Sequence, residues 1–288
     1  MSGTLGGPIW LVGGGKMGGA LARGWLAAGL PPPELAIVEP DAERRAELAQ
    51  LGPVTFAASA AELRAPVPPR ALVLAVKPQT MRAVLPAWTA RIGCETLVLS
   101  IAAGIRIATL EAAFPPGTGV VRAMPNTPAA IGRGATVLVA GPNATAEQRA
   151  LAEALLAAVG EVHWIADEEL MHLVTALSGG GPAYVFYLIE ALAEAGTALG
   201  LPAELAERLA RATVAGAGEL ARSSPAPAAR LRADVTSPGG TTAEALRVLM
   251  APEAWPRLLR EALAAAARRS RELGGEVPGR AASGGGAG

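Results

Sequence analysis

Ile9-Trp-Leu-Val-Gly13-Gly-Gly15-Lys-Met-Gly18 joins a short apolar run to the start of a helix that the pattern predicts over residues 17–28. The turn between them carries glycine at the three positions of Gly-x-Gly-x-x-Gly, namely Gly13, Gly15 and Gly18. Between a strand and a helix, this pattern is typical of a dinucleotide-binding turn. Its glycines permit a tight bend, a close approach of the backbone to a pyrophosphate and close helix–strand packing. The chain has 35 glycines, so the match alone is weak, but the strand and helix beside it favour cofactor binding.

The second predicted strand ends at Glu39, and this residue bears on which cofactor binds. Glu39 follows Gly15 by 24 residues (39 − 15 = 24), near the spacing of about 20 at which an acid bonds the adenine ribose. A carboxylate there repels a 2′-phosphate and favours NADH, whereas Arg44 and Arg45, one helical turn on, are placed to attract that phosphate. Capping of the next helix by Glu39 or Asp41 is the alternative interpretation. The sequence therefore leaves NADPH and NADH both open.

Strand-like and helix-like segments alternate through the first half of the chain. Several of the strands are continuous apolar runs, as expected for parallel strands covered on both faces. The predicted strands span residues 9–12, 35–39, 54–57, 71–76, 96–101, 120–124, 135–140 and 162–165. The predicted helices span residues 17–28, 42–51, 81–91 and 146–159, the last opened by a Thr145-x-x-Gln148 capping box. This alternation predicts a Rossmann-type, doubly wound α/β domain with a parallel sheet over residues 1–166.

The strand signal stops near residue 167, and the rest of the chain has a helical pattern. Helices are predicted over residues 168–177, 183–199, 203–221, 242–250 and 252–273. They form an all-α domain over residues 167–274, and residues 275–288 form a Gly/Ala/Ser-rich tail that we expect to be mobile. Since this domain has few aromatic residues, its core is thin, and we expect a second copy of the chain to cover its apolar faces. A self-sufficient bundle is the alternative.

Composition and charge exclude several classes of protein. The 25 basic and 25 acidic residues cancel, so nothing favours binding to nucleic acid or to an anionic membrane surface. Cys94 is the one cysteine, which rules out an internal disulfide, and no Cys/His spacing predicts a metal site. Residues 170–189 form an uncharged window long enough to span a membrane, yet Ser178-Gly-Gly-Gly-Pro182 interrupts it. The start of the chain lacks a basic n-region, so we expect a cytoplasmic protein.

Three further loops follow predicted parallel strands, at the sheet edge where ligands bind in open α/β folds. They are Val76-Lys77-Pro78, Ala102-Ala103-Gly104 and Pro125-Asn126-Thr-Pro128. Each by itself is an ordinary turn, but three of them beside the Gly-rich turn predict a binding crevice. His163 and His172 are the only histidines, and both are interpreted as structural. Because no nucleophile with a base partner is visible, the sequence favours hydride chemistry carried by a cofactor.

The second half contains one polar stretch, Asp234-Val-Thr-Ser-Pro-Gly-Gly-Thr-Thr-Ala-Glu-Ala-Leu246. Pro238-Gly239-Gly240 predicts a turn, and Thr241-x-x-Glu244 predicts a capping box that opens a helix. The free N–H groups and the positive dipole end of a helix start can hold a small carboxylate without an arginine. The alternative is an ordinary capped connection between two helices.

Six motifs follow one another along residues 8–273. They are Gly13-Gly-Gly-Lys-Met-Gly18, Val76-Lys-Pro78, Ala102-Ala-Gly104, Met124-Pro-Asn-Thr-Pro128, Thr175-Ala-Leu-Ser-Gly179 with Gly181-Pro-Ala-Tyr184, and the stretch from Val235 to Leu246. In this order and at this spacing, the chain resembles the pyrroline-5-carboxylate reductase family. The last two motifs are the specific ones, because many dehydrogenases share the Gly-rich turn.

The resemblance implies a Rossmann domain followed by a helical dimerisation domain, with an active site completed across the dimer. It implies reduction of L-1-pyrroline-5-carboxylate to L-proline by NADPH or NADH, which is the last step of proline biosynthesis. A homodimer is the implied assembly, with a ring of dimers as a higher state.

The resemblance also assigns roles to residues of this chain. Thr242 would hydrogen-bond the ring nitrogen of the substrate and act as the catalytic residue. The substrate-binding residues would be Ser237, Gly239, Gly240, Thr241 and Thr242. The cofactor-binding residues would be Gly13, Gly14, Gly15, Lys16, Met17, Gly18, Glu39, Ser59, Val76, Lys77, Pro78, Ala103, Asn126 and Asp234.

Three residues depart from the pattern of the family. Lys16 replaces a commoner asparagine, which adds a cation near the phosphates and bears on the choice of cofactor. Gly180 replaces a serine and removes a hydroxyl, and Ser59 stands where an asparagine often contacts the cofactor. None of the three removes a group that hydride transfer requires.

Two other functions fit parts of the sequence. A β-hydroxyacid dehydrogenase shares the order of domains but needs a catalytic lysine in the helical domain, and both lysines here lie within the first 80 residues. A non-catalytic dinucleotide sensor would keep the Gly-rich turn but has no use for the polar loop from Ser237 to Thr242. The reductase is the interpretation that uses both features.

Overall fold

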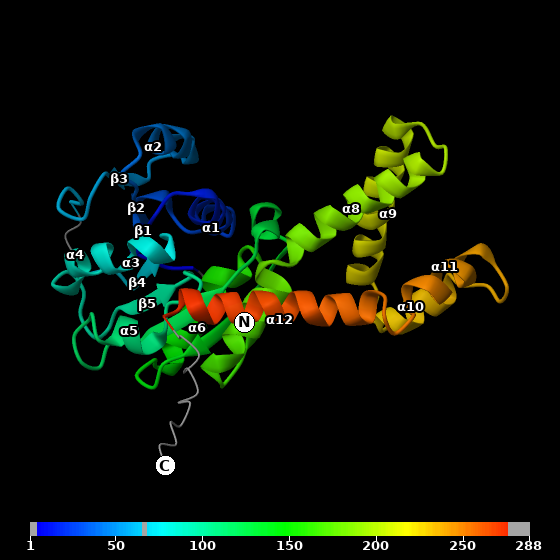
Figure 1. Cartoon of the computed structure of the whole chain (residues 1–288). Coiled ribbons are helices and arrows are strands. Elements are labelled where there is room, and N and C mark those ends of the chain that lie inside the picture. Colours follow the sequence, from blue (N-terminus) through cyan, green and yellow to red (C-terminus); the bar gives the residue numbers. More distant parts are fainter. Residues whose placement is uncertain (1–4, 65–67, 276–288) are drawn as a thin grey trace, which may run out of the picture. The chain divides into compact units, whose positions relative to one another are not determined.

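The computed structural model describes residues 5–64 and 68–275, which form two compact units (Figure 1). The first unit contains the chain up to Gly179 together with the segment from Ala266 onward, and the second is Gly180–Ala265. The domain boundary at residue 166 stays a prediction. The tail expected over residues 275–288 lies, except for Gly275, outside the described residues.

An eight-stranded sheet forms the centre of the first unit, with the strand order β3-β2-β1-β4-β5-β6-β7-β8. The strands are β1 Ile9–Val12, β2 Leu35–Val38, β3 Thr55–Ala57, β4 Ala71–Leu74, β5 Leu97–Ser100, β6 Val120–Met124, β7 Gly134–Ala140 and β8 Gly160–Trp164. Strands β1 to β6 pair in parallel, β7 runs antiparallel to β6, and β8 is parallel to β7. The doubly wound α/β domain is confirmed. The antiparallel pair was not predicted, because an apolar run does not reveal its direction.

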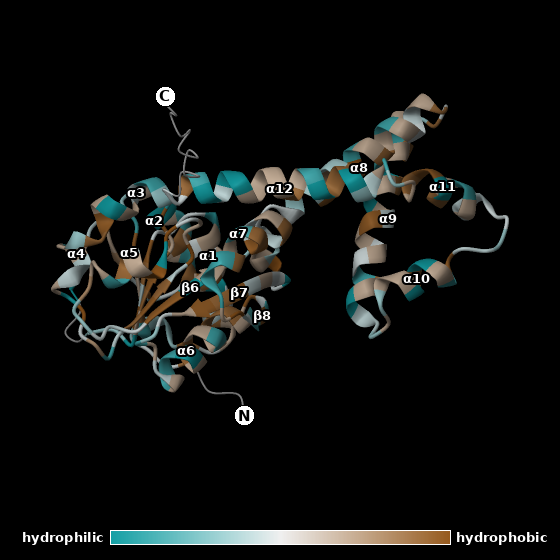
Figure 2. Cartoon of the chain, turned by 60° about the horizontal axis from the view of Figure 1, so that its bottom comes forward, coloured by the Kyte–Doolittle hydropathy of each residue, from teal (hydrophilic) through white to brown (hydrophobic). Residues whose placement is uncertain are grey.

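The inner strands are buried on both faces, which is why they are apolar along their whole length. Successive side chains of β1 point to opposite sides of the sheet. Ile9 and Leu11 therefore belong to one core cluster with Trp25, whereas Trp10 and Val12 belong to the other core cluster. Figure 2 shows these strands in the colours of hydrophobic residues, with helices around them.

The helices of the first unit cover the two faces of the sheet. They are α1 Lys16–Ala27, α2 Ala42–Leu48, α3 Pro78–Val84, α4 Pro86–Thr89, α5 Ile107–Glu111, α6 Ala146–Ala157 and α7 Met171–Val174. Short 3-10 helices are η1 Pro32–Glu34, η2 Ala49–Leu51, η3 Thr127–Ile131 and η4 Glu168–Leu170, and η5 Thr175–Gly179 is a π-helix.

Two predictions about helix ends have different outcomes. The capping box of α6 is confirmed, because Thr145 Oγ1 accepts the N–H of Gln148 and Gln148 Oε1 accepts the N–H of Thr145. The single helix predicted over residues 81–91 is wrong. The structure has α3 and α4 instead, with Pro78 and Pro86 each at the first position of its helix, where proline is favoured.

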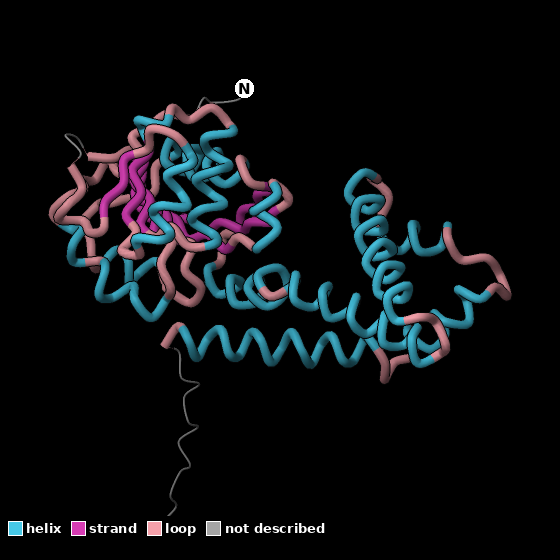
Figure 3. The backbone as a smooth tube through the Cα atoms, turned by 90° about the horizontal axis from the view of Figure 1, so that it is seen from above, coloured by secondary structure: helices cyan, strands magenta, loops and turns pink. Residues whose placement is uncertain are grey.

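The second unit is entirely helical, as predicted, and Figure 3 shows all the strands gathered in the first unit. Its helices are α8 Gly181–Ala198, α9 Ala203–Ser223, α10 Ala228–Asp234, α11 Thr241–Leu249 and the first part of α12 Trp255–Leu273. Helix α10 was not predicted. Helices α8 and α9 pack against each other, yet no residue of α8 is buried within the single chain.

Large apolar side chains of α8 remain exposed in the single chain. Their exposed fractions reach 59% for Phe186 and 69% for Tyr187. An apolar surface of this kind marks an interaction site in a folded protein. Among the described residues, no helix combines the length and apolar character that a membrane span needs.

Candidate functional site

The Gly-rich turn connects β1 to α1 in a conformation that only glycine fits. Gly13 has a φ of +102°, and a Cβ there would lie 2.6 Å from the carbonyl oxygen of Ala75. A Cβ at Gly18 would collide with the carbonyl oxygen of Gly13. The strand–turn–helix arrangement predicted for this stretch is therefore confirmed, and each of these two glycines has a steric reason.

The start of α1 is suited to an anion. Gly15 is the N-cap, no side chain caps the helix, and the first turn contains no acidic residue. The first N–H groups of a helix have no partner inside it, and its dipole places positive charge at this end. Lys16 is exposed at this end and Met17 is half-buried. The turn thus fits the pyrophosphate of a dinucleotide.

Glu39 is bonded to the same turn. Its side chain is 4% exposed, and its Oε2 accepts the N–H of Gly14 at 2.7 Å. Its Oε1 accepts the N–H of Asp41 at 3.0 Å. The N-cap of α2 is Asp41, whose carboxylate accepts the N–H groups of Glu43 and Arg44. Helix capping by Glu39 is therefore excluded, and its carboxylate lies against the glycines.

The two arginines that follow have different roles. Arg45 Nη1 donates to the carbonyl oxygens of Glu39 and Pro40, at 2.6 and 2.8 Å, and so supports the backbone. Arg44 pairs loosely with Asp41, at 3.8 Å. Its Nη1 is 3.9 Å from the point that a Cβ of Gly15 would occupy. Arg44 is therefore the arginine beside the turn.

The other predicted cofactor residues of the first unit follow the carboxyl ends of strands β3 to β6. Val76 Cγ1 lies 3.3 Å from the Cβ position of Gly13, and Lys77 is the N-cap of α3 with Pro78 at its first position. Ala103 is half-buried between the buried Ala102 and Gly104. The geometry brings Val76 and Glu39 to the Gly-rich turn itself.

Ser59 and Asn126 already have partners in the protein. Ser59 Oγ donates to Glu62 Oε1 at 3.1 Å. Asn126 Nδ2 donates to the carbonyl oxygen of Ser178 at 3.1 Å, and its Oδ1 accepts the N–H of Ala135 at 2.8 Å. The side chain of Asn126 therefore ties the loop after β6 to η5. A cofactor contact by either residue stays a prediction.

The predicted substrate loop belongs to the second unit. The turn is formed by the N–H of Gly240, which donates to the carbonyl oxygen of Ser237 at 3.1 Å, and by Gly239, whose φ is +68°. A Cβ at Gly240 would meet Ser237 Oγ, so the hydroxyl of Ser237 lies over the turn. Thr241 and Thr242 are exposed.

The capping box predicted for this loop is wrong. Helix α11 begins at Thr241, its N-cap is Gly240, and no side chain caps it. Glu244 pairs instead with Arg247, at 3.0 Å. Since glycine has no side chain to offer, the first N–H groups of α11 are left without a side-chain acceptor. Asp234, predicted to lie near the cofactor, forms an ion pair with Arg230 at 2.9 Å.

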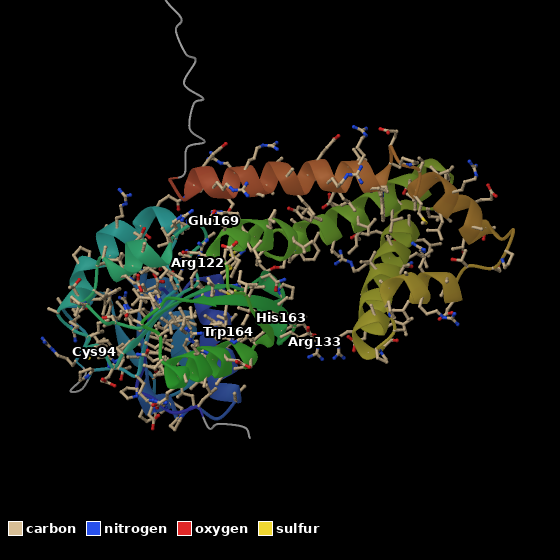
Figure 4. The ribbon with its side chains drawn as sticks, turned by 90° about the horizontal axis from the view of Figure 1, so that it is seen from below. Cys94, Arg122, Arg133, His163, Trp164 and Glu169 are labelled. Carbon is tan, nitrogen blue, oxygen red and sulfur yellow. The ribbon has the colours of Figure 1, made fainter. Side chains whose placement is uncertain are left out.

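A partly buried ion pair between Arg122 and Glu168 was not predicted. Arg122 on β6 is 2% exposed, and its Nη1 lies 2.8 Å from Glu168 Oε1. The same oxygen accepts the N–H of Ile107, at 3.0 Å. Arg106 forms an ion pair with Glu169, the residue after Glu168, at 2.5 Å. Figure 4 labels Arg122 and Glu169. The signal was present, because an arginine inside an apolar strand needs a partner once it is buried.

Comparison with known proteins finds two family matches in different parts of the chain and relatives over most of its length. Residues 8–104 match the family described as "NADP oxidoreductase coenzyme F420-dependent", and residues 168–273 match "Pyrroline-5-carboxylate reductase dimerisation". The pyrroline-5-carboxylate reductase of Pseudomonas aeruginosa is 43% identical over 265 residues, which cover 92% of this chain and 96% of that protein.

Two solved structures agree with this similarity. A pyrroline-5-carboxylate reductase from Coxiella burnetii has a TM-score of 0.85 at 36% identity, covering 92% of this chain and 98% of its own. The Plasmodium falciparum pyrroline carboxylate reductase, solved with NADP bound, has a TM-score of 0.76 at 29% identity, covering 92% of this chain and 97% of its own. Since the similarity runs through the dinucleotide turn, the sheet and the helical unit, this chain belongs to the pyrroline-5-carboxylate reductase family.

Proposed function

We propose that this chain reduces L-1-pyrroline-5-carboxylate to L-proline with hydride from NADPH or NADH, as the last step of proline biosynthesis. The observation that carries the proposal is the 43% identity to a pyrroline-5-carboxylate reductase over 92% of the chain. A dinucleotide turn in one unit and an uncapped helix start in the other supply the two binding functions that this reaction needs.

The residues of the first unit fit the cofactor. When bound, the reduced nicotinamide supplies the hydride. The Gly-rich turn and the uncapped start of α1 would hold the pyrophosphate, and the Glu39 carboxylate beside Gly14 would face the adenine ribose. The rest of the cofactor site, at the carboxyl ends of β4 and β5, would be lined by Lys77, Pro78 and Ala103. The small side chain of Ala103 allows a flat ring to approach the backbone closely.

The residues of the second unit fit the substrate. The N–H groups at the start of α11 and the Ser237 hydroxyl would hold the carboxylate, because no side chain caps this helix end and Glu244, the acidic residue of its first turn, is paired with Arg247. The Thr242 hydroxyl would hydrogen-bond the ring nitrogen. Hydride would add to the imine carbon, which becomes C5 of proline, as the C=N double bond becomes single, and the nitrogen would take a proton that water ultimately supplies. Thr242 would hold the ring nitrogen in the orientation that hydride addition and protonation require.

Self-association follows from the family match over residues 168–273 and from the exposed apolar side chains of α8. We propose a homodimer as the basic unit, a ring of dimers as the higher assembly, and an active site completed across the dimer. We also propose that the enzyme works in the cytoplasm, where a reductase drawing on the NAD(P)H pool would operate.

A direct assay tests the proposed function. Purified protein is mixed with pyrroline-5-carboxylate and either NADPH or NADH, and nicotinamide fluorescence and proline are followed together. The expected result is a loss of nicotinamide fluorescence matched by the formation of proline. In a separate control with a β-hydroxy acid and oxidised cofactor, we expect no reduction of NAD(P)⁺. Folded protein that turns over neither cofactor with pyrroline-5-carboxylate contradicts the proposal.

A further inference from the structure

The loop after β5, residues 101–106, carries the residue that the proposed function places at the nicotinamide, and it is held from two sides. Ala103 is half-buried, while its neighbours Ala102 and Gly104 are buried. The N–H of Ala102 donates to Ser100 Oγ at 3.3 Å, inside the loop. The carbonyl oxygen of Arg106 accepts the N–H groups of Thr109 and Leu110 at the start of α5, at 3.1 and 3.3 Å. Two further anchors come from segments far away in the sequence.

The first anchor is η4. Glu168 accepts the N–H of Ile107, which directly follows the loop, and is itself fixed by the buried Arg122. Arg106 adds an ion pair to Glu169. Charged hydrogen bonds of this kind are stronger than neutral ones, and the burial of Arg122 removes water that would weaken them. The far end of the loop is therefore fixed.

The second anchor is the end of α12, residues 266–275, which belongs to the first unit. Gly104 has a φ of +77°, and a Cβ there would lie 3.2 Å from the backbone nitrogen of Gly274. A Cβ at Gly274 would lie 2.9 Å from the carbonyl oxygen of Gly104. Two glycines thus let two backbones touch, one residue away from Ala103.

The end of α12 is itself held by a buried hydrogen bond. Ser270 Oγ lies 2.9 Å from Nδ1 of His172 on α7, and the two residues are 5% and 1% exposed. Ala267, one turn earlier, is 2% exposed. The N–H of Gly274 then donates to the carbonyl oxygen of Ser270 at 3.2 Å. The position of Gly274 therefore depends on the contact between Ser270 and His172.

We propose that Ser270 and Gly274 are positioning residues for hydride transfer, acting through Gly104 on the loop that carries Ala103. This inference rests on the proposed function. The contact is made to the backbone of the loop, because the atoms nearest to the Cβ positions of Gly104 and Gly274 are backbone atoms of the other segment. A small displacement of this loop alters the distance that hydride must cross, and an error of about 1 Å can cost about a hundredfold in rate.

Gly274→Ala is the primary test, with Gly93→Ala as its matched control, since a Cβ at Gly93 meets nothing within 4 Å. We expect Gly274→Ala to lower kcat about ten- to a hundredfold and to leave the KM for NADPH within about threefold. Amide hydrogen exchange over residues 101–107, measured without cofactor or substrate, should speed up about tenfold. Gly93→Ala should match the wild type in both measurements.

Ser270→Ala provides a second variant in case the first misfolds. It removes the bond to His172, so it should reproduce both the lower kcat and the faster exchange of residues 101–107. The double variant Ser270→Ala/Gly274→Ala should be less impaired than the product of the single effects, since both act through one contact. Fully multiplicative effects of the two substitutions contradict the proposal.

Different results contradict the proposed reaction and the proposed anchor of the loop. Wild-type protein without turnover contradicts the function, whereas the exchange measurement needs no turnover and tests the anchor by itself. Loop exchange and kcat at wild-type values in folded Gly274→Ala protein overturn the inference. A fall in kcat that is the same in Gly93→Ala overturns it as well.

Discussion

The carboxylate of Glu39 accepts the N–H groups of Gly14 and Asp41 and lies nearly fully buried against the Gly-rich turn. A carboxylate has about four acceptor sites, so two remain for ribose hydroxyls. Spacing from the glycines was enough to predict this residue as a cofactor contact. The sequence did not reveal that Glu39 also holds the turn, because that bond depends on the fold of both segments.

Glu39→Ser tests the choice of cofactor. Removal of the negative charge should raise the ratio of kcat/KM for NADPH to that for NADH by about tenfold, or about 1.4 kcal/mol, because a carboxylate repels the 2′-phosphate. Steady-state kinetics with both cofactors measures the ratio. Glu39→Gln is the control, since it keeps an acceptor for one backbone N–H while removing the charge, and it should shift the ratio in the same direction. An unchanged ratio in both variants contradicts the assignment.

Thr242→Ala tests the residue assigned to the ring nitrogen. We expect kcat to fall about ten- to a hundredfold while the Kd for NADPH, measured by fluorescence, stays within about twofold, because the hydroxyl acts on the substrate. Thr242→Ser keeps the hydroxyl and should recover most of the rate. If NADPH binding is lost instead, Thr242 has been assigned to the wrong ligand.

Among the elements, α11 shows where reasoning from sequence succeeded and where it failed. Its start was placed correctly to within one residue, because Pro238-Gly239-Gly240 is a strong turn signal. The prediction of a capping box was wrong, because the N-cap is Gly240 rather than Thr241 and Glu244 pairs with Arg247. The uncapped start is the property that a carboxylate site requires.

Gly240→Asp tests this helix start. An aspartate at the N-cap should satisfy the free N–H groups and hold or raise the melting temperature, since such caps contribute about 1 kcal/mol. It should also raise the KM for pyrroline-5-carboxylate at least about tenfold, because its charge competes with the substrate carboxylate. Gly240→Ala has the same Cβ without the charge and should raise that KM much less. Equal effects of the two substitutions argue against a carboxylate site.

For the entire chain, the sequence was enough to predict the order of the two units. It was not enough to predict the direction of every strand or the ion pairs between distant segments. Strand–helix alternation and the Gly-rich turn predict the α/β unit because both are local patterns. The antiparallel β7 and the pair between Arg122 and Glu168 depend on contacts across long sequence distances. The exposed apolar face of α8 agrees with the thin core expected for the helical unit.

Phe186→Asp tests the assembly. Phe186 is 59% exposed on α8, and we expect a second copy of the chain to cover it. Burying one such side chain contributes about 1.5–3 kcal/mol, and a twofold interface counts it twice, so the dimer Kd should rise at least about a hundredfold. Light scattering after gel filtration measures the mass. Ile131→Asp is the control, since Ile131 is 76% exposed but lies outside residues 168–273. A Phe186→Asp protein with wild-type mass contradicts this assignment.

Transfer of hydride to the imine is tested most directly with reduced cofactor that carries deuterium at its transferable position. The wild-type protein is incubated with pyrroline-5-carboxylate and this cofactor, and the product is analysed by mass spectrometry and NMR. The account predicts L-proline with one deuterium at C5 for each cofactor oxidised. Cofactor oxidation that yields no proline, or proline without deuterium at C5, would contradict it.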